Sequence, residues 1–113
     1  MAMKIKTQIK VLKEAKERIR SGEYYGMCIA IACVLCEGGF WKGVETYIPS
    51  FTKEHVTKLC VKNHLELPTD YTFWWDIHDA DIRVKVFDLL IEELESKTFL
   101  GRITKLFRRR VLG

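Results

Sequence analysis

The chain has 113 residues, which suits one folded domain and leaves no room for a second core of ordinary size. Its 48% hydrophobic and 30% charged residues are typical of a globular protein and argue against disorder outside the ends. The net charge is unevenly distributed: residues 1–20 and 98–113 each carry +5, whereas residues 21–97 carry −6. We expect the basic ends either to pack on an acidic body, of this or a neighbouring chain, or to contact phosphates.

Two features of the sequence indicate a cytoplasmic protein. Residues 1–20 are charged throughout and lack the apolar stretch of a secretory signal. The most apolar stretch, residues 24–36, is shorter than the roughly 20 residues that a membrane-spanning helix needs. Cysteines in such a protein are expected to be small core residues and not disulfide partners. The four cysteines are Cys28, Cys33, Cys36 and Cys60.

The first predicted element is an amphipathic helix over residues 5–20, because apolar residues recur there every three or four positions. Ser21 and Gly22 are expected to end this helix. Its predicted buried stripe consists of Ile5, Ile9, Leu12, Ala15 and Ile19.

A second helix is predicted over about residues 24–36. It is apolar on every side, so we expect other elements to surround it at the centre of the fold. The Glu-Gly-Gly segment at residues 37–39 is expected to end it, because glycine adopts the left-handed conformation that closes helices. Residues 40–51 mix aromatic side chains with glycine and proline and predict only a loop or a short turn.

The third predicted helix begins after Thr52 and continues to about Asn63. Thr52 is a favourable N-cap residue, and Phe51 and Val56 occupy the two positions of a hydrophobic staple.

The strongest helix pattern begins near Asp76 or Asp79. Its predicted buried stripe is Ile82, Val86, Leu89, Leu90 and Leu94, widened by Phe87 and Ile91. These patterns together predict an all-α fold, a compact bundle of about four helices around a central apolar helix, formed by residues 1–97. Residues 98–113 are predicted to form a basic amphipathic C-terminal extension. Its predicted phosphate or partner contacts are Arg102, Lys105, Arg108, Arg109 and Arg110.

Cysteine spacing allows two chemical interpretations besides burial. Cys33 and Cys36 form a C-x-x-C pair, but the pair lies at a predicted helix C-terminus, where the helix dipole weakens a redox thiolate. With Cys60 and His64 the pair supplies four potential zinc ligands. The first pair, however, lies inside an apolar helix and not in the turn that normally wraps a metal. Core cysteines are the favoured interpretation, and the sequence alone leaves zinc open.

The segment Asp-Ile-His-Asp-Ala-Asp at residues 76–81 resembles the His-Asp pair of the HD phosphohydrolases, which are all-helical, metal-dependent enzymes. In this resemblance His78 and Asp79 form the pair and His55 is the upstream histidine. No aspartate follows Asp88, so the distant downstream aspartate of that family is missing. Gly-rich phosphate loops, G-x-S-x-G elbows and H-E-x-x-H helices are also absent from the sequence. We therefore expect a protein that is not an enzyme and carries no cofactor or metal.

A dense aromatic run before the last helix is the candidate binding site. Aromatic faces can stack on a nucleotide base, while a guanidinium group can hold a phosphate. The structural alternative is that the run simply seals one end of the core. The predicted ligand-binding residues are Tyr71, Phe73, Trp74, Trp75, His78 and Arg83.

Over residues 5–97 the chain resembles a family of small bacteriophage proteins of uncharacterised function. The stretches that carry the resemblance are the first helix ending in Arg-Ser-Gly at 20–22, Met-Cys-Ile-Ala-Ile at 27–31, and Phe-Trp-Trp at 73–75 leading to Arg83, Phe87, Leu90 and Ile91. Some small phage proteins of this size disarm bacterial immunity. The resemblance therefore implies an anti-defence role in the host cytoplasm.

The favoured functional hypothesis is a non-enzymatic, homo-oligomeric phage-type protein that sequesters a nucleotide immune signal. One alternative is an inhibitor that binds a bacterial defence protein directly, through its acidic body or its amphipathic tail. Another is a small nucleic-acid-binding protein that uses the basic tail. No membrane partner is expected.

Overall fold

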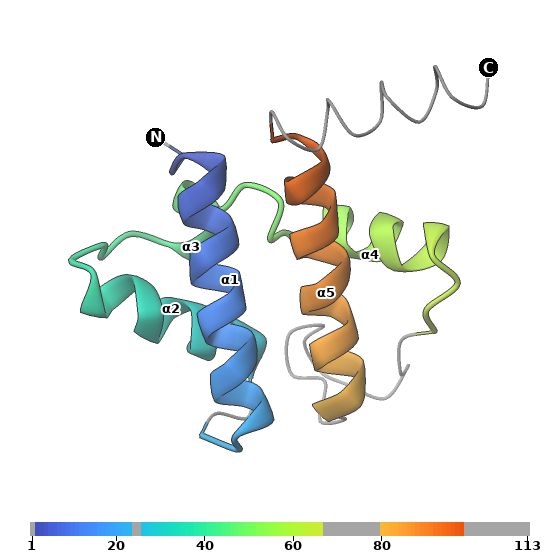
Figure 1. Ribbon diagram of the computed structural model, residues 1–113, viewed down its shortest axis with the longest axis horizontal. Coiled ribbons are helices and arrows are strands. Elements are labelled where there is room, and N and C mark those ends of the chain that lie inside the picture. Colours follow the sequence, from blue (N-terminus) through green and yellow to red (C-terminus); the bar gives the residue numbers. More distant parts are fainter. Residues whose placement is uncertain (1, 24–25, 67–79, 99–113) are drawn as a thin grey trace.

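The computed structural model describes residues 2–23, 26–66 and 80–98, and these residues form five helices (Figure 1). The helices are α1 (Ile5–Arg20), α2 (Met27–Glu37), α3 (Val44–Tyr47), α4 (Lys53–Lys62) and α5 (Ala80–Ser96). No strand occurs in the described ranges. The predicted all-α bundle is confirmed, and α3 is the short turn allowed for residues 40–51.

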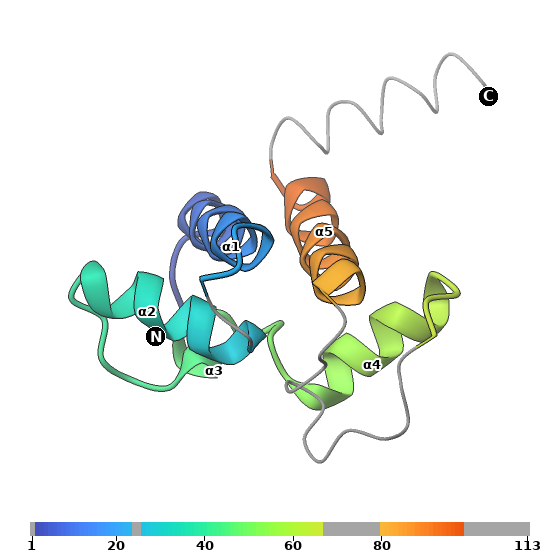
Figure 2. The same cartoon turned by 90° about the horizontal axis from the view of Figure 1, so that it is seen from below.

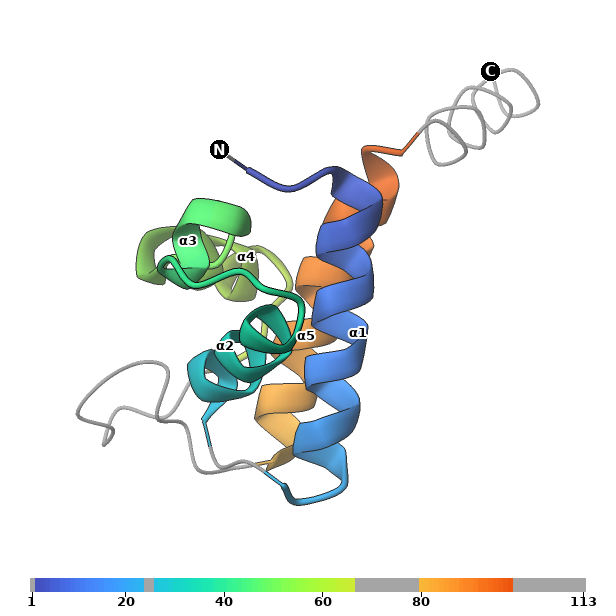
Figure 3. The ribbon, with the colours of Figure 1, turned by 90° about the vertical axis from the view of Figure 1, so that its left-hand side faces the viewer.

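The helices are arranged in two layers. The antiparallel helices α1 and α5 lie side by side and form the most extensive helix pair of the described residues. Helices α2, α3 and α4 cover one face of this pair, with α2 crossing beneath α1 and α4 beneath α5 (Figures 2 and 3). On the α1–α5 pair, Lys16 Nζ lies 2.6 Å from Asp88 Oδ1 and ties the two helices together.

The predicted helix ends are confirmed by backbone geometry. Gly22 and Gly39 have φ angles of +82° and +85°, the left-handed conformation in which a side chain is disfavoured. After α2, the backbone N–H of Phe40 donates to the carbonyl of Leu35 at 2.9 Å. This bond closes the last turn of α2 and turns the chain sharply away from the helix.

Helix α4 begins where the capping pattern predicted. The Thr52 hydroxyl accepts a hydrogen bond of 3.2 Å from the backbone N–H of His55. Phe51 and Val56, the two staple positions, are both buried. Helix α4 ends at Lys62, and His64, two residues later, has a φ angle of +57°, a left-handed conformation that is rare for a residue other than glycine.

One continuous core holds the two layers together. Each of the four longer helices contributes at least three buried hydrophobic residues, and the α3 region adds three more. The largest fully buried side chains include Leu12, Met27, Ile31, Phe87 and Leu90. Burial of this kind is the main stabilising contribution in a domain of this size.

Two details of the core differ from expectation. Helix α2 is not surrounded on every side, because Ile29 is 57% exposed while Ile31 is fully buried. The central position belongs to α1, which packs against both α5 and α2. In α5, Ile82 and Leu89 are only partly buried, and Arg83 is 5% exposed. Hydrophobicity alone could not predict this, because it does not show which face of a helix its neighbours leave uncovered.

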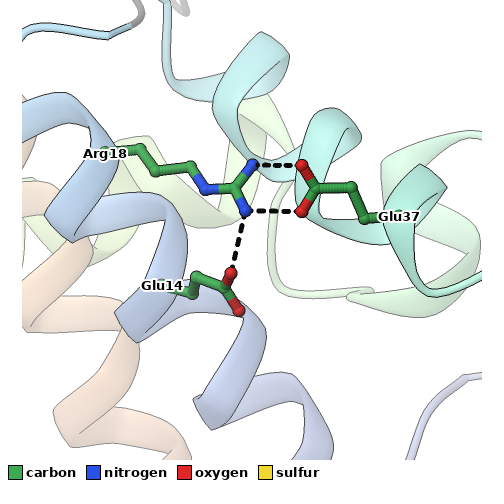
Figure 4. Close-up of polar contacts among 3 residues, drawn as sticks. All are labelled: Glu14, Arg18 and Glu37. Atoms are coloured by element: carbon green, nitrogen blue, oxygen red, sulfur yellow. Dashed lines mark hydrogen bonds and ion pairs between the residues drawn. The ribbon is translucent and has the colours of Figure 1, made fainter.

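An ion-pair network anchors α2 to α1 (Figure 4). Arg18 on α1 donates from both terminal nitrogens to the Glu37 carboxylate at the end of α2, at 2.9 Å from Nη1 to Oε1. Its Nη2 also lies 2.8 Å from Glu14 Oε1. The hydrogen bonds from Arg18 hold the pKa of Glu37 below its ordinary value.

Candidate functional site

Most residues of the predicted nucleotide site lie outside the described residues. This holds for Tyr71, Phe73, Trp74, Trp75 and His78, and for the tail residues Arg102, Lys105, Arg108, Arg109 and Arg110. Only Arg83 is described; it lies on α5 and is 5% exposed. The nucleotide site and the basic extension therefore stay predictions.

A groove lies between the end of α1 and the beginning of α5. It has a volume of about 580 Å³ and is lined by Arg20, Ala80, Asp81, Val84, Lys85 and Asp88. In the sequence, the aromatic run ends five residues before Ala80. Binding pockets for small molecules have volumes of this order. Two cationic and two carboxylate side chains line the groove, so it carries both positive and negative charge.

The four residues of the zinc hypothesis all lie among the described residues. Cys60 is buried, which raises the pKa of its thiol, whereas Cys33 and Cys36 are half-buried on α2. His64 follows α4 and is exposed. No group of three or more potential ligands of the His, Cys, Asp or Glu type gathers within the described ranges. The arrangement expected of a tetrahedral zinc site is therefore not found for these four residues.

His55, the upstream histidine in the HD-type resemblance, contacts the neighbouring helix. Its Nε2 lies 2.6 Å from Glu93 Oε1, and the pair joins α4 to α5. The two partner residues of that resemblance, His78 and Asp79, lie outside the described residues. In the described part of the chain, His55 has a structural partner, and an HD-type metal site stays untested.

The most exposed large hydrophobic side chain of the described residues is Trp41, at 77%. It lies in the loop of residues 38–43, which connects α2 to α3 and is called the Trp41 loop below. Both neighbours of Trp41 contact Tyr47 of α3. The Phe40 ring packs edge-on against the Tyr47 ring with centroids 5.1 Å apart, and the Lys42 backbone N–H donates to the Tyr47 hydroxyl at 3.3 Å. The loop is therefore fixed on both sides of an indole that points into solvent.

The glycines of the Trp41 loop explain its shape. Gly39 adopts a left-handed conformation, and a Cβ atom added to Gly38 would lie 3.3 Å from the Phe40 ring. Gly38 and Gly39 thus allow the chain to turn back after α2, so that Phe40 packs against Tyr47. Lys42 forms none of the ion pairs found within the described ranges, and its charge is available beside the indole.

Trp41 was not predicted as a functional residue, because its segment predicts only a loop or a short turn. The available signal was an aromatic residue between a Gly-Gly pair and a lysine, outside any periodic apolar pattern. Such a residue has no helix face through which to enter the core. A large aromatic residue that is not expected to be buried is a candidate contact for a partner.

No protein family, curated protein or solved structure matches this chain. The resemblance to bacteriophage proteins therefore stays a prediction. None of the described helices combines the length and the apolar character that crossing a bilayer requires.

Proposed function

We propose that this protein acts by binding another protein and that Trp41 is the anchor of the interface. The observation that carries this proposal is an indole that is 77% exposed on a loop fixed at both neighbouring residues. Tryptophan is among the residues that contribute most to protein interfaces when a partner pocket encloses them. Because the loop is already ordered, binding immobilises few additional groups.

The positive charge of Lys42, beside the indole, indicates what kind of partner surface is expected. Lys42 is exposed and has no ion-pair partner among the described residues, so a matching surface has an apolar pocket with carboxylates at its rim. The resemblance to phage proteins suggests that this partner is a bacterial defence protein. In this proposal the protein inhibits its partner in the host cytoplasm by occupying its surface and needs no catalytic group.

Site-specific photo-cross-linking in bacterial cells tests this proposal. A photoreactive phenylalanine at position 41 is expected to capture one discrete protein, and the same group at position 61 is the matched control. Val61 is 70% exposed but lies on α4. With the captured protein purified, Trp41→Ala is expected to lower affinity by roughly 30-fold or more, as for an interface hot spot. Val61→Ala is expected to change it less than about twofold. Equal affinities for wild type and Trp41→Ala would overturn the proposal.

Sequestration of a nucleotide is the second candidate function. The observation that favours it is the groove of about 580 Å³ at the beginning of α5, which Arg20 and Lys85 help to line. A nucleotide phosphate would contact these cations, and its base would stack on the predicted aromatic residues. Calorimetry with a panel of linear and cyclic nucleotides tests this candidate. Unaltered nucleotide affinity in a Trp74→Ala, Trp75→Ala double variant, or in Lys85→Ala, would show that the nucleotide does not bind at the predicted site. Lys53→Ala on α4 is the control variant.

A further inference from the structure

Tyr47 of α3 contacts two segments that are far apart in the sequence. Its backbone carbonyl accepts a hydrogen bond of 3.0 Å from the N–H of Met3, which lies just before α1. Its hydroxyl accepts a hydrogen bond of 3.3 Å from the N–H of Lys42 in the Trp41 loop. The N-terminal segment and the Trp41 loop are therefore both held against α3, beside which they lie in Figure 3.

The residues before α1 are held by a second hydrogen bond. The carbonyl of Met3 accepts a hydrogen bond of 2.7 Å from Gln8 Nε2, and Gln8 is buried. Lys4, the next residue, is the N-cap of α1 and is exposed. The backbone of Lys4 thus has a defined position relative to Tyr47 and, through Tyr47, relative to the Trp41 loop.

Two exposed lysines belong to the segments that Tyr47 holds. Lys4 and Lys42 form none of the ion pairs found in the part of the chain that the structure describes. A carboxylate also lies beside the loop: Glu45, in the first turn of α3, is exposed, and a Cβ atom added to Gly43 would lie 3.2 Å from its Oε1. The surface around α3 therefore carries two positive charges and one negative charge at known positions.

We propose that the interface anchored by Trp41 extends across α3 to Lys4 and that the partner is a protein with an acidic surface, whose carboxylates face Lys4 and Lys42. This inference rests on the proposed function, in which Trp41 binds a partner protein. A standard interface covers roughly 800 Å² of each partner, which is wide enough to include the Trp41 loop, α3 and Lys4 together. The two lysines attract the acidic surface during encounter, and the enclosed indole then holds it.

Charge and anchor are expected to act on different rate constants. Charges at the rim of an interface change mainly the association rate and its dependence on salt, whereas an enclosed anchor changes mainly the dissociation rate. Lys4 and Lys42 are therefore expected to raise the association rate, and Trp41 to lower the dissociation rate. Glu45 is expected to act against the lysines, because it repels the carboxylates of the partner.

Photo-cross-linking at position 4 tests how far the interface extends. A photoreactive phenylalanine at position 4 is expected to capture the same protein, identified by mass spectrometry, as the same group at position 41. Position 53 is the matched control, because Lys53 is also exposed but lies at the beginning of α4. Capture at position 41 alone, or equal capture at positions 4 and 53, would overturn the extended interface and leave the role of Trp41 intact. No capture at position 4 or position 41 would overturn the proposed function as well.

Surface plasmon resonance with the captured protein, purified and immobilised, tests the charge of the partner. The double variant Lys4→Gln, Lys42→Gln is expected to lower the association rate by roughly threefold or more at low salt, to approach wild type at high salt, and to keep the dissociation rate within about twofold. Lys53→Gln, Lys58→Gln is the matched control, because it removes the same charge from two exposed lysines of α4, and it should associate nearly like wild type. Glu45→Gln is expected to associate faster than wild type.

Circular dichroism verifies that these variants are folded. Equal association rates for the two double variants, or slower association of Glu45→Gln, would overturn the acidic partner. Binding of the protein to phosphatidylglycerol vesicles that the substitutions of Lys4 and Lys42 abolish, without capture at position 4, would assign the surface to an anionic membrane and also overturn the proposal.

Discussion

Arg18 Nη1 on α1 lies 2.9 Å from Glu37 Oε1 at the end of α2, and the second terminal nitrogen of Arg18 bonds the other carboxylate oxygen. This paired contact fixes the C-terminal end of α2 against α1 (Figure 4). In this orientation one side of the helix enters the core, and Ile29 on the other side is turned to solvent. The proposed role of Trp41 depends on this orientation, because the Trp41 loop begins directly after Glu37.

The contact between Arg18 and Glu37 predicts a pH-dependent contribution to stability. Hydrogen bonds from Arg18 lower the pKa of Glu37 below its ordinary value of 4.5. A carboxyl group with a lowered folded-state pKa stabilises the fold above the pKa of the unfolded chain, and this contribution is lost as pH falls through the folded pKa. Glu37→Gln is expected to lower the thermal unfolding midpoint at pH 7. The gap from wild type should close below pH 4.5, and a gap that persists unchanged into strong acid would contradict this assignment.

Two isoleucines of α2 provide a direct test of its orientation. Ile31 is fully buried and Ile29 is 57% exposed, although they are two residues apart. Ile31→Ala is expected to lower the free energy of unfolding by about 2 to 5 kcal/mol, because it leaves a cavity in the core. Ile29→Ala should change it by less than about 0.5 kcal/mol in dilute solution.

Chemical denaturation of both isoleucine variants at the same low concentration measures the difference. If Ile31→Ala does not fold, Ile31→Val keeps the comparison possible, with an expected loss of about 0.5 to 1.5 kcal/mol. Equal losses at the two positions would mean that α2 is oriented differently.

The cap of α4 gives a third prediction. Thr52→Ala removes the hydroxyl that accepts the His55 backbone N–H and is expected to lower the free energy of unfolding by about 1 kcal/mol. Thr57→Ala is the matched control, because Thr57 is exposed on the same helix and its hydroxyl bonds only the carbonyl of Lys53. Urea titrations of the two variants compare the losses. A larger loss for the control would argue against Thr52 as the cap.

The left-handed residue after α4 gives a fourth prediction. His64 has a φ angle of +57°, which costs a residue with a side chain roughly 1 to 2 kcal/mol. His64→Gly removes this cost but makes the unfolded chain more flexible, so we expect a net gain of about 0.5 to 1 kcal/mol. Lys58→Gly, in the middle of α4, is expected to lose about 1 kcal/mol. A loss of stability in His64→Gly, measured by thermal unfolding, would show that the histidine side chain makes a necessary contact.

The sequence predicted those parts of the fold that local signals determine. Ser21 and Gly22 end α1, Thr52 caps α4, and residues 37–39 end α2, because each of these features depends on a few neighbouring residues. The orientation of α2 was not predictable in this way. Ile29 and Ile31 are the same residue type in the same helix, and which of them is buried depends on the packing of α2 against neighbours such as α1 and α3.

The candidate site, like the fold, could be predicted from the sequence only in part. The aromatic run at residues 71–75 was predicted to bind a nucleotide, but it lies outside the described residues, so this stays a prediction. Trp41 was not recognised, because its exposure results from contacts of Phe40 and Lys42 with Tyr47, a residue in the next helix. Exposure of a single aromatic residue depends on tertiary contacts that hydrophobic periodicity does not describe.

Native mass spectrometry of the protein purified from bacterial cells tests whether Trp41 anchors a bound protein, because one spectrum reports bound protein, bound nucleotide and subunit number. We expect a complex with one discrete protein that is retained by Val61→Ala and lost from Trp41→Ala. A nucleotide mass retained by wild type and Trp41→Ala alike, with no bound protein in any sample, would contradict the claim and favour sequestration of a nucleotide.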